Sequence, residues 1–137
     1  MATRRILTFL HRRTWRRRDN GAPVSSPLER TAELDGLVVD PTSDEVALVM
    51  VETRAWDGGP DQLRQLREKT SAYLGMVVDG ALIRDHPEAE GRRIRIELDC
   101  RGGAPGAAAE PTLRNLADVV GRYGVRLVVV GGGTAGG

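Results

Sequence analysis

The chain of 137 residues has a formal net charge of +1 and a single cysteine, Cys100, which excludes an internal disulfide framework. Its length predicts one domain that can bury a core without disulfides or a metal. The longest apolar runs have six residues, whereas a transmembrane helix needs about 20. We therefore expect no transmembrane segment and a cytoplasmic location.

The small net charge hides an uneven distribution. Residues 1–20 hold seven arginines and one acidic residue, which leaves 13 basic and 18 acidic side chains, a net −5, in residues 21–137. This acidic body argues against specific nucleic-acid binding. Residues 1–31 are predicted to form a disordered, Arg-rich tail and linker. The functional alternative for the tail is weak contact with an anionic surface, either a membrane or a nucleic acid.

The domain itself is expected at residues 32–131, and it opens with two strands. Residues 37–39 are aliphatic, residues 40–44 contain turn-forming Asp, Pro and Ser, and residues 46–51 are apolar at every position. A strand that is apolar on both faces is typical of the centre of a sheet. The pattern predicts a hairpin with a loop of about five residues.

A helix is predicted to begin at residues 59–61, where the sequence is Gly-Pro-Asp. Gly suits the N-cap, Pro the first helical position, and Asp the positive end of the helix dipole. Apolar residues then recur every three or four positions as far as Val77 and define one buried stripe. Gly80 is expected to interrupt the helix and Pro87 to end it. The charged residues lie largely off the stripe: Arg64, Arg67, Glu68 and Lys69.

Residues 92–100 alternate between apolar and charged side chains, which indicates a strand with one wet face. The charged face carries Arg93, Arg95, Glu97 and Asp99, and the apolar face carries Ile94, Ile96, Leu98 and Cys100. A second helix is expected to end at Gly124, followed by a last strand at residues 125–130. Residues 132–137 are predicted to be a disordered, Gly-rich tail.

The predicted order is therefore β-β-α-β-α-β. Both helical connections should be right-handed, and both helices should cover the sheet face opposite the charged one. The expected fold class is α+β: a two-layer sandwich with a mixed four-stranded sheet and both helices on one face. The first strand should run antiparallel to the second.

Several segments together resemble a known family. They are the sequence ETRAWDG at residues 52–58, the helical residues 62–69, the His-Pro-Glu sequence at residues 86–88, and IRIELDC at residues 94–100. With these residues the chain resembles a family of small bacterial proteins catalogued as a domain of unknown function. The family usually begins near residue 32, so the Arg-rich tail departs from it, as does the loop at residues 101–109. The resemblance implies no activity.

The densest cluster of functional-looking residues lies where a strand leads into a helix: Glu52, Arg54, Trp56 and Asp57. Two carboxylates beside an arginine and an indole suit a ligand site or acid–base chemistry. In the alternative, Trp56 anchors the bend against the core, Asp57 caps backbone amides, and Glu52 pairs with Arg54. We favour this structural interpretation, because acid–base catalysis also needs partner geometry.

No catalytic residue, cofactor or metal site is predicted elsewhere. The GxGxxG match at residues 131–136 has no helix after it in the chain, and the Gly-rich loop at residues 101–106 lacks the spacing and lysine of a P-loop. His86 lacks ligands at metal-binding spacing. Cys100 lies on the apolar face of its strand and is interpreted as a small buried hydrophobic residue. The charged sheet face has no aromatic residue on which RNA bases stack.

Two functions remain open. The first is a non-catalytic interaction or accessory module that contacts an unknown protein or a second copy of itself. Its interface would be a sheet edge or the sheet face of Arg93, Arg95, Glu97 and Asp99. The second is a small-molecule-binding or enzymatic domain centred on residues 52–57. We prefer the first because signals for a nucleophile, a metal and a cofactor are all missing.

Overall fold

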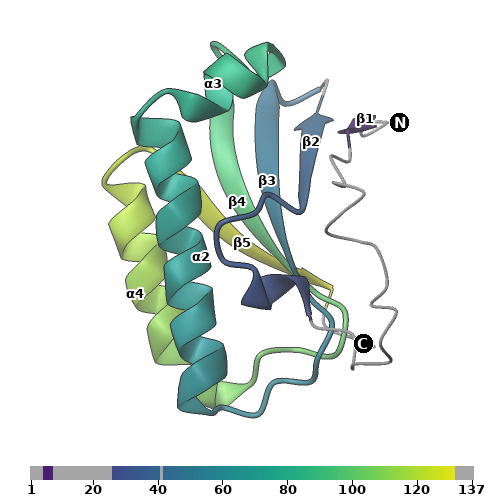
Figure 1. The fold of residues 1–137 in the computed structure, drawn as a ribbon, viewed down its shortest axis with the longest axis vertical. Helices are drawn as coiled ribbons and strands as arrows, with labels where there is room; N and C mark the ends of the chain where they lie inside the picture. The colour runs from purple at the N-terminus through teal and green to yellow at the C-terminus, as the bar shows by residue number, and fades with distance from the viewer. Residues whose placement is uncertain (1–4, 8–25, 41, 132–137) are drawn as a thin grey trace.

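The computed structural model describes residues 26–40 and 42–131, together with the backbone of residues 5–7 (Figure 1). Its strands are β1 (Arg5–Leu7), β2 (Gly36–Asp40), β3 (Glu45–Glu52), β4 (Arg93–Cys100) and β5 (Arg126–Gly131). Its α-helices are α2 (Pro60–Val78), α3 (Ala81–Asp85) and α4 (Glu110–Gly121), and its 3₁₀ turns are η1 (Pro27–Glu29), η2 (Pro87–Ala89) and η3 (Ala107–Ala109).

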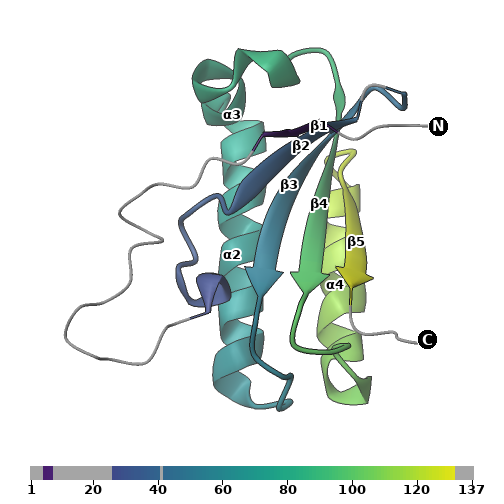
Figure 2. The same cartoon turned by 90° about the vertical axis from the view of Figure 1, so that its right-hand side faces the viewer.

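The five strands form one mixed sheet in the order β1-β2-β3-β4-β5 (Figure 2). β2 pairs antiparallel with β3, while β3, β4 and β5 run parallel to one another. The predicted four-stranded sheet and the β-β-α-β-α-β order are therefore confirmed in β2 to β5. The three-residue strand β1, antiparallel to β2, adds a fifth strand that the sequence pattern did not predict.

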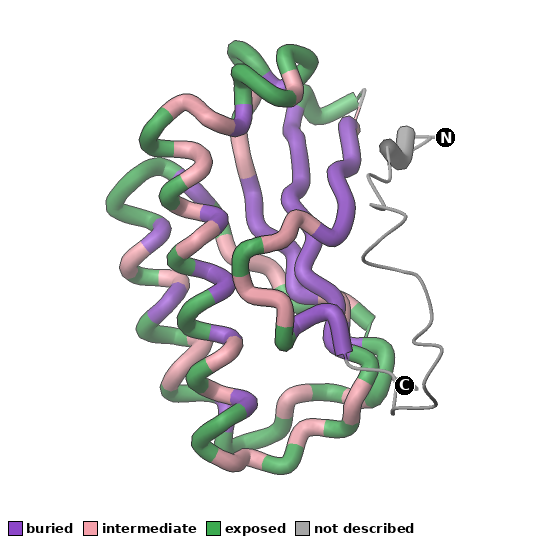
Figure 3. The backbone as a smooth tube through the Cα atoms, in the orientation of Figure 1, coloured by how far each residue is buried: buried purple, intermediate pink, exposed green. Residues whose placement is uncertain are grey.

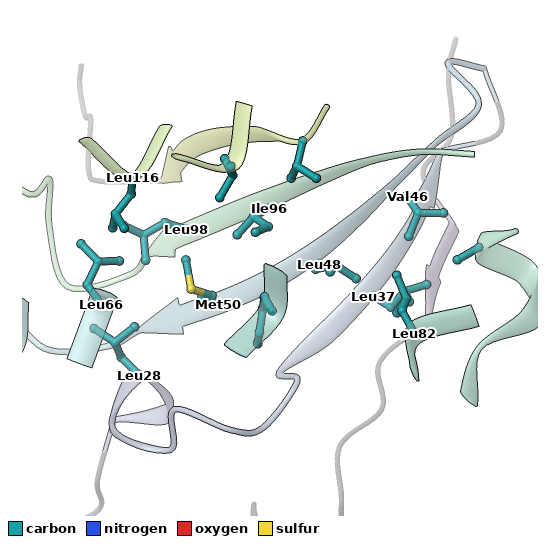
Figure 4. Close-up of a cluster of buried hydrophobic side chains, with 14 of the residues drawn as sticks. Leu28, Leu37, Val46, Leu48, Met50, Leu66, Leu82, Ile96, Leu98 and Leu116 are labelled. Carbon is teal, nitrogen blue, oxygen red and sulfur yellow. The ribbon is translucent and has the colours of Figure 1, made fainter. Parts of the chain in front are cut away.

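The helices α2 and α4 pack on the same face of the sheet and make the second layer (Figure 1). Between the layers lies an aliphatic core in which alternate residues of the central strands meet the two helices (Figure 4). Leu48 and Met50 of β3 and Leu98 of β4 are fully buried there. Each such side chain contributes about 1.5–3 kcal/mol relative to exposure. The predicted two-layer sandwich follows from this alternation.

The residues at which α2 begins and ends also match the prediction. Gly59 is the N-cap and Pro60 the first helical residue. The helix ends at Val78, and Gly80 adopts the left-handed conformation (φ +84°) that opens α3. The prediction for Lys69 is wrong, because this side chain is fully buried. Its spacing from Leu66 and Tyr73 places it on the stripe that faces the sheet.

Residues 26–31 were assigned to the linker, but the structure packs most of them against the domain. Leu28 is fully buried in the core, and Ser26 and Pro27 are buried as well. Figure 3 shows this segment continuing the buried region of β2 and β3. Packed residues therefore already occur before residue 32, at residues 26–28. The rest of the predicted N-terminal tail, apart from the backbone of residues 5–7, lies outside the described residues, as do residues 132–137.

Within the described part of the chain, no helix is long and apolar enough to cross a membrane.

Candidate functional site

The bend after β3 brings Glu52 and Arg54 together, as their spacing suggested. The Glu52 side chain is fully buried, and its carboxylate accepts hydrogen bonds from Arg54 Nη2 (2.7 Å) and from the Arg54 backbone N–H (2.8 Å). Ser26 Oγ and Gln62 Nε2 (2.9 Å) donate to the same carboxylate. Glu52 therefore joins the end of β3 to the N-terminal segment and to the first turn of α2.

These hydrogen bonds decide the protonation state of Glu52. Burial alone would raise the pKa of its carboxyl, but the donors Arg54, Ser26 and Gln62 together more than offset burial, so the pKa lies below the ordinary 4.5. Glu52 is thus an anion at neutral pH, with both oxygens occupied by donors from the chain. This arrangement suits a structural joint, because a general base needs a lone pair that faces its substrate.

Arg54, which binds Glu52, also connects the bend to α2 and to η1. Its Nη2 donates to Gln65 Oε1 of α2 at 2.7 Å, and its Nη1 lies 3.4 Å from Glu29 Oε2 of η1. One guanidinium therefore ties together three segments that are far apart in sequence. The planar, multi-donor head of arginine suits this use better than the single ammonium of lysine.

The other two predicted site residues have their main contacts elsewhere than on Glu52. Asp57 Oδ1 accepts the backbone N–H of Gly59 at 2.7 Å, which fixes the entry into α2. Trp56 packs against the core cluster, and its buried indole N–H has no hydrogen-bond partner among the described residues. The four residues of the predicted cluster therefore divide into one ion pair, one backbone cap and one core anchor.

The Gly-rich loop at residues 101–106 lies against this bend. A Cβ atom at Gly102 would stand 2.5 Å from the backbone carbonyl of Arg54, so only glycine fits. Close approach of two backbones explains this glycine. The sequence pattern only argued against a P-loop there and did not predict this contact.

Cys100 lies at the end of β4 with its side chain in the core and only 1% exposed. Burial raises the pKa of its thiol to about 11. The thiolate, which is the reactive form, is therefore scarce at neutral pH.

A second buried polar cluster was missed by sequence reasoning. Lys69 Nζ lies 2.8 Å from Asp35 Oδ2 and donates to the Pro27 carbonyl at 2.7 Å. The hydroxyl of Tyr73 lies 2.8 Å from the Val49 carbonyl and accepts the Asp35 N–H at 3.0 Å. Burial lowers the pKa of Lys69 and raises that of Asp35, each against the attraction of its partner. The spacing of Lys69, which places it on the buried stripe of α2, is the sequence feature that could have revealed this cluster.

The charged face of β4 differs from its predicted wet state. Arg95 and Glu97 are only 8% and 5% exposed, and Arg95 Nη2 bonds Glu97 Oε2 at 2.6 Å. Arg95 Nη1 also bonds Glu45 Oε1 at 2.6 Å, and Arg126 Nη2 reaches Glu45 at 2.9 Å. Arg95 therefore pairs with Glu97 of its own strand and with Glu45 of β3, and Arg126 of β5 binds Glu45 in turn.

The rest of that face is mixed. Arg93 is exposed, and Asp99 is paired at 3.0 Å with Arg101. The residues that continue this face on β2 and β3 make a small apolar cluster: Val38, Ala47, Val49 and Val51. The four predicted interface residues therefore share one face, but Arg95 and Glu97 are already paired with each other, and Arg95 also with Glu45 of β3.

An open groove of about 290 Å³ lies between α2 and α4, and its lining includes Arg67, Thr112 and Leu116. No group of three or more His, Cys, Asp or Glu side chains in the described ranges is placed to hold a metal ion.

A family model described as "Family of unknown function (DUF6572)" matches residues 26–130. The match starts at Ser26, whereas the resemblance implied a start near residue 32. Neither the curated proteins nor the solved structures gave a match.

Proposed function

Because the chain belongs to a family of unknown function (DUF6572), we propose a role from its geometry alone: a non-catalytic interaction module that binds protein through the outer edge of β5. The chemistry around the bend supports a non-catalytic role. Glu52, the best acid–base candidate, has its oxygens taken by Ser26, Arg54 and Gln62. The predicted ligand or enzyme site at residues 52–57 is therefore the weaker alternative.

The observation that carries the proposal is the position of β5. It is the last strand of the sheet, paired on one side with β4, and no described strand pairs with its other side (Figure 2). An edge strand presents unpaired backbone N–H and C=O groups that can pair with another chain. The edge also carries Val129, which is 41% exposed.

The sequence of β5 contains few of the features that protect an edge. Natural edges are blunted by proline, by charges, by bulges or by short length. β5 has six residues, pairs with β4 in unbroken register, and reads Arg-Leu-Val-Val-Val-Gly, with its one charge at the first position. A long apolar edge of this kind suits strand addition.

The experiment compares two single substitutions at exposed valines. The full chain is used as bait in native lysate, with Val129→Lys as the edge variant and Val78→Lys, at a 58% exposed position on α2, as the control. We expect a stoichiometric partner that wild type and Val78→Lys capture and that Val129→Lys loses. Equal capture by both variants, or a wild type that neither captures a stoichiometric partner nor self-associates, would overturn the proposal.

A further inference from the structure

We propose that the partner at the β5 edge is a second copy of this chain, with the two β5 strands paired antiparallel about a two-fold axis at Val128. The inference rests on the proposed function and names its partner. It follows from the register of β5, from its burial pattern, and from the position of its single charge.

The register with β4 assigns the two faces of β5. Leu127 and Val129 pair with Ile96 and Leu98, whose side chains are in the core, so they lie on the helix side. Arg126, Val128 and Val130 pair with Arg95, Glu97 and Asp99 and lie on the opposite side. Directly opposed residues of an antiparallel pair point to the same face. A two-fold axis between two β5 strands must therefore set one residue directly opposite the same residue of the second copy.

The axis at Val128 gives the most self-complementary pairing. It sets Leu127 opposite Val129 on the helix side, and it sets Val128 opposite itself on the other side. The half-buried Leu127 and the exposed Val129 would then cover each other across the interface. The same strand segment serves both halves, because residues 127–129 are aliphatic in both directions from the axis.

Charge supports this register. Arg126 falls opposite Val130, whose neighbour in the same row of the sheet is Asp99. The one charged residue of the strand, which is ion-paired with Glu45 in its own chain, therefore faces an aliphatic residue of the second copy, and no arginine faces another. Like charges directly opposite would destabilise the pair. An axis at Leu127 would pair only residues 126–128, and an axis at Val129 would leave Arg126 beyond the paired segment.

The layers of the domain are compatible with the pairing. A two-fold axis perpendicular to the sheet keeps the helices of both copies on one side, so the two α4 helices, each beside its own β5, would flank the new strand pair (Figure 2). Tyr123, which is 57% exposed, lies in the turn between α4 and β5. Stable dimers bury about 1,600 Å² in total, so the α4 face must contribute beyond the six-residue strand.

The test introduces a charge at Val128, the residue that lies opposite its own copy at the axis. Val128→Lys and Val128→Glu are measured separately and as an equimolar mixture by sedimentation velocity, beside wild type and Val78→Lys. We expect wild type and Val78→Lys to be dimers, each Val128 variant to be a monomer, and the mixture to restore a dimer. Circular dichroism checks that the monomeric variants are folded.

A covalent readout complements sedimentation and does not depend on a charged side chain. Opposed residues in an antiparallel pair have Cα atoms about 4.5–5.5 Å apart, which is within the range of a disulfide. Val128→Cys should therefore form a covalent dimer on mild oxidation, whereas Val78→Cys should not. Cys100 is buried and does not compete in the folded protein.

The outcomes separate this inference from the proposed function. A monomeric wild type that still captures a lysate partner through Val129 would overturn the self-pairing and leave the interaction module standing. A monomeric wild type without such capture would overturn both. A dimer that persists in both Val128 variants, without the Val128→Cys crosslink, would place the interface elsewhere and reject the β5 pairing.

Discussion

Lys69 and Asp35 form an ion pair, with 2.8 Å between Nζ and Oδ2, inside the domain, where the two side chains are 0% and 1% exposed. The pair joins the middle of α2 to the residue that precedes β2. Lys69 also holds the Pro27 carbonyl, so the same ammonium ties the N-terminal segment to the helix. This contact explains how residues 26–35 belong to the packed domain despite their linker-like composition.

Removing one partner of this pair should lower the free energy of unfolding. Lys69→Met leaves the Asp35 carboxylate buried without its counter-ion, and such changes cost about 3–5 kcal/mol. We expect a loss of that order in the free energy of unfolding, measured by urea denaturation. The exposed neighbour Arg67→Met is the control and should change stability by less than about 0.5 kcal/mol.

The double variant separates loss of charge balance from loss of packing. Asp35→Asn combined with Lys69→Met removes both charges and keeps an acceptor for the Val51 N–H, which Asp35 Oδ2 now accepts at 2.8 Å. It should therefore be more stable than Lys69→Met alone. If Lys69→Met proves no worse than Arg67→Met, the buried pair does not stabilise this domain.

The lowered pKa of Glu52 predicts that the stability of the domain depends on pH. Its pKa is lower in the folded protein than the ordinary 4.5, so around and below that value the unfolded chain binds the proton more readily. Stability from Glu52 is therefore complete well above pH 4.5 and is lost as the pH falls through the folded pKa. Glu52→Gln should cost roughly 1.5–3 kcal/mol at pH 7, the range for hydrogen bonds to a charged group.

The pH dependence of stability distinguishes the loss of the Glu52 charge from a poor fit of the glutamine amide that replaces it. Urea unfolding of wild type and Glu52→Gln at pH 7, 4.5 and 3 should show the stability difference narrowing toward low pH. Glu68→Gln, on the exposed side of α2, controls for the change in net charge and should stay within about 0.5 kcal/mol of wild type. A difference that stays constant with pH would show that the Glu52 carboxylate is not specifically stabilised in the folded state.

The parts of the fold that depend on local pattern were predictable. The apolar strand β3, the alternation in β4 and the Gly-Pro start of α2 each follow from short-range spacing, and together they specify the two-layer arrangement. The resemblance to a family of unknown function was likewise confirmed. The charge on Lys69 was misleading, since residue type and spacing disagreed and spacing was correct.

The site was less predictable because its contacts are long-range. The pairing of Glu52 with Arg54 follows from their separation of two residues, across the end of β3. The donation from Ser26 to Glu52 spans 26 residues, and Arg95 reaches Glu45 across 50. Alternation in β4 identifies which residues share a face, but it carries no information on how the neighbouring strands satisfy their charges.

Cys100 should be unreactive in the folded protein. With a thiol pKa of about 11, roughly one molecule in a thousand carries the thiolate at pH 8, and the side chain is 1% exposed. We expect no measurable reaction with Ellman's reagent over minutes in buffer and one thiol per chain in urea. Rapid labelling of the native protein would mean that β4 opens locally or that the thiol is accessible.

Two glycines make a matched pair for the contact between the Gly-rich loop and the bend. Gly102→Ala places a Cβ atom 2.5 Å from the Arg54 carbonyl, so one backbone must shift, and overpacking of this kind costs about 1–3 kcal/mol. Gly75→Ala, inside α2 with no atom within 4 Å of the new Cβ, should instead stabilise by about 0.5–1 kcal/mol. Thermal denaturation should therefore move the two midpoints in opposite directions. If Gly102→Ala also raises the midpoint, the loop does not press against Arg54, and the bend is held by Glu52, Arg54 and Gln62 alone.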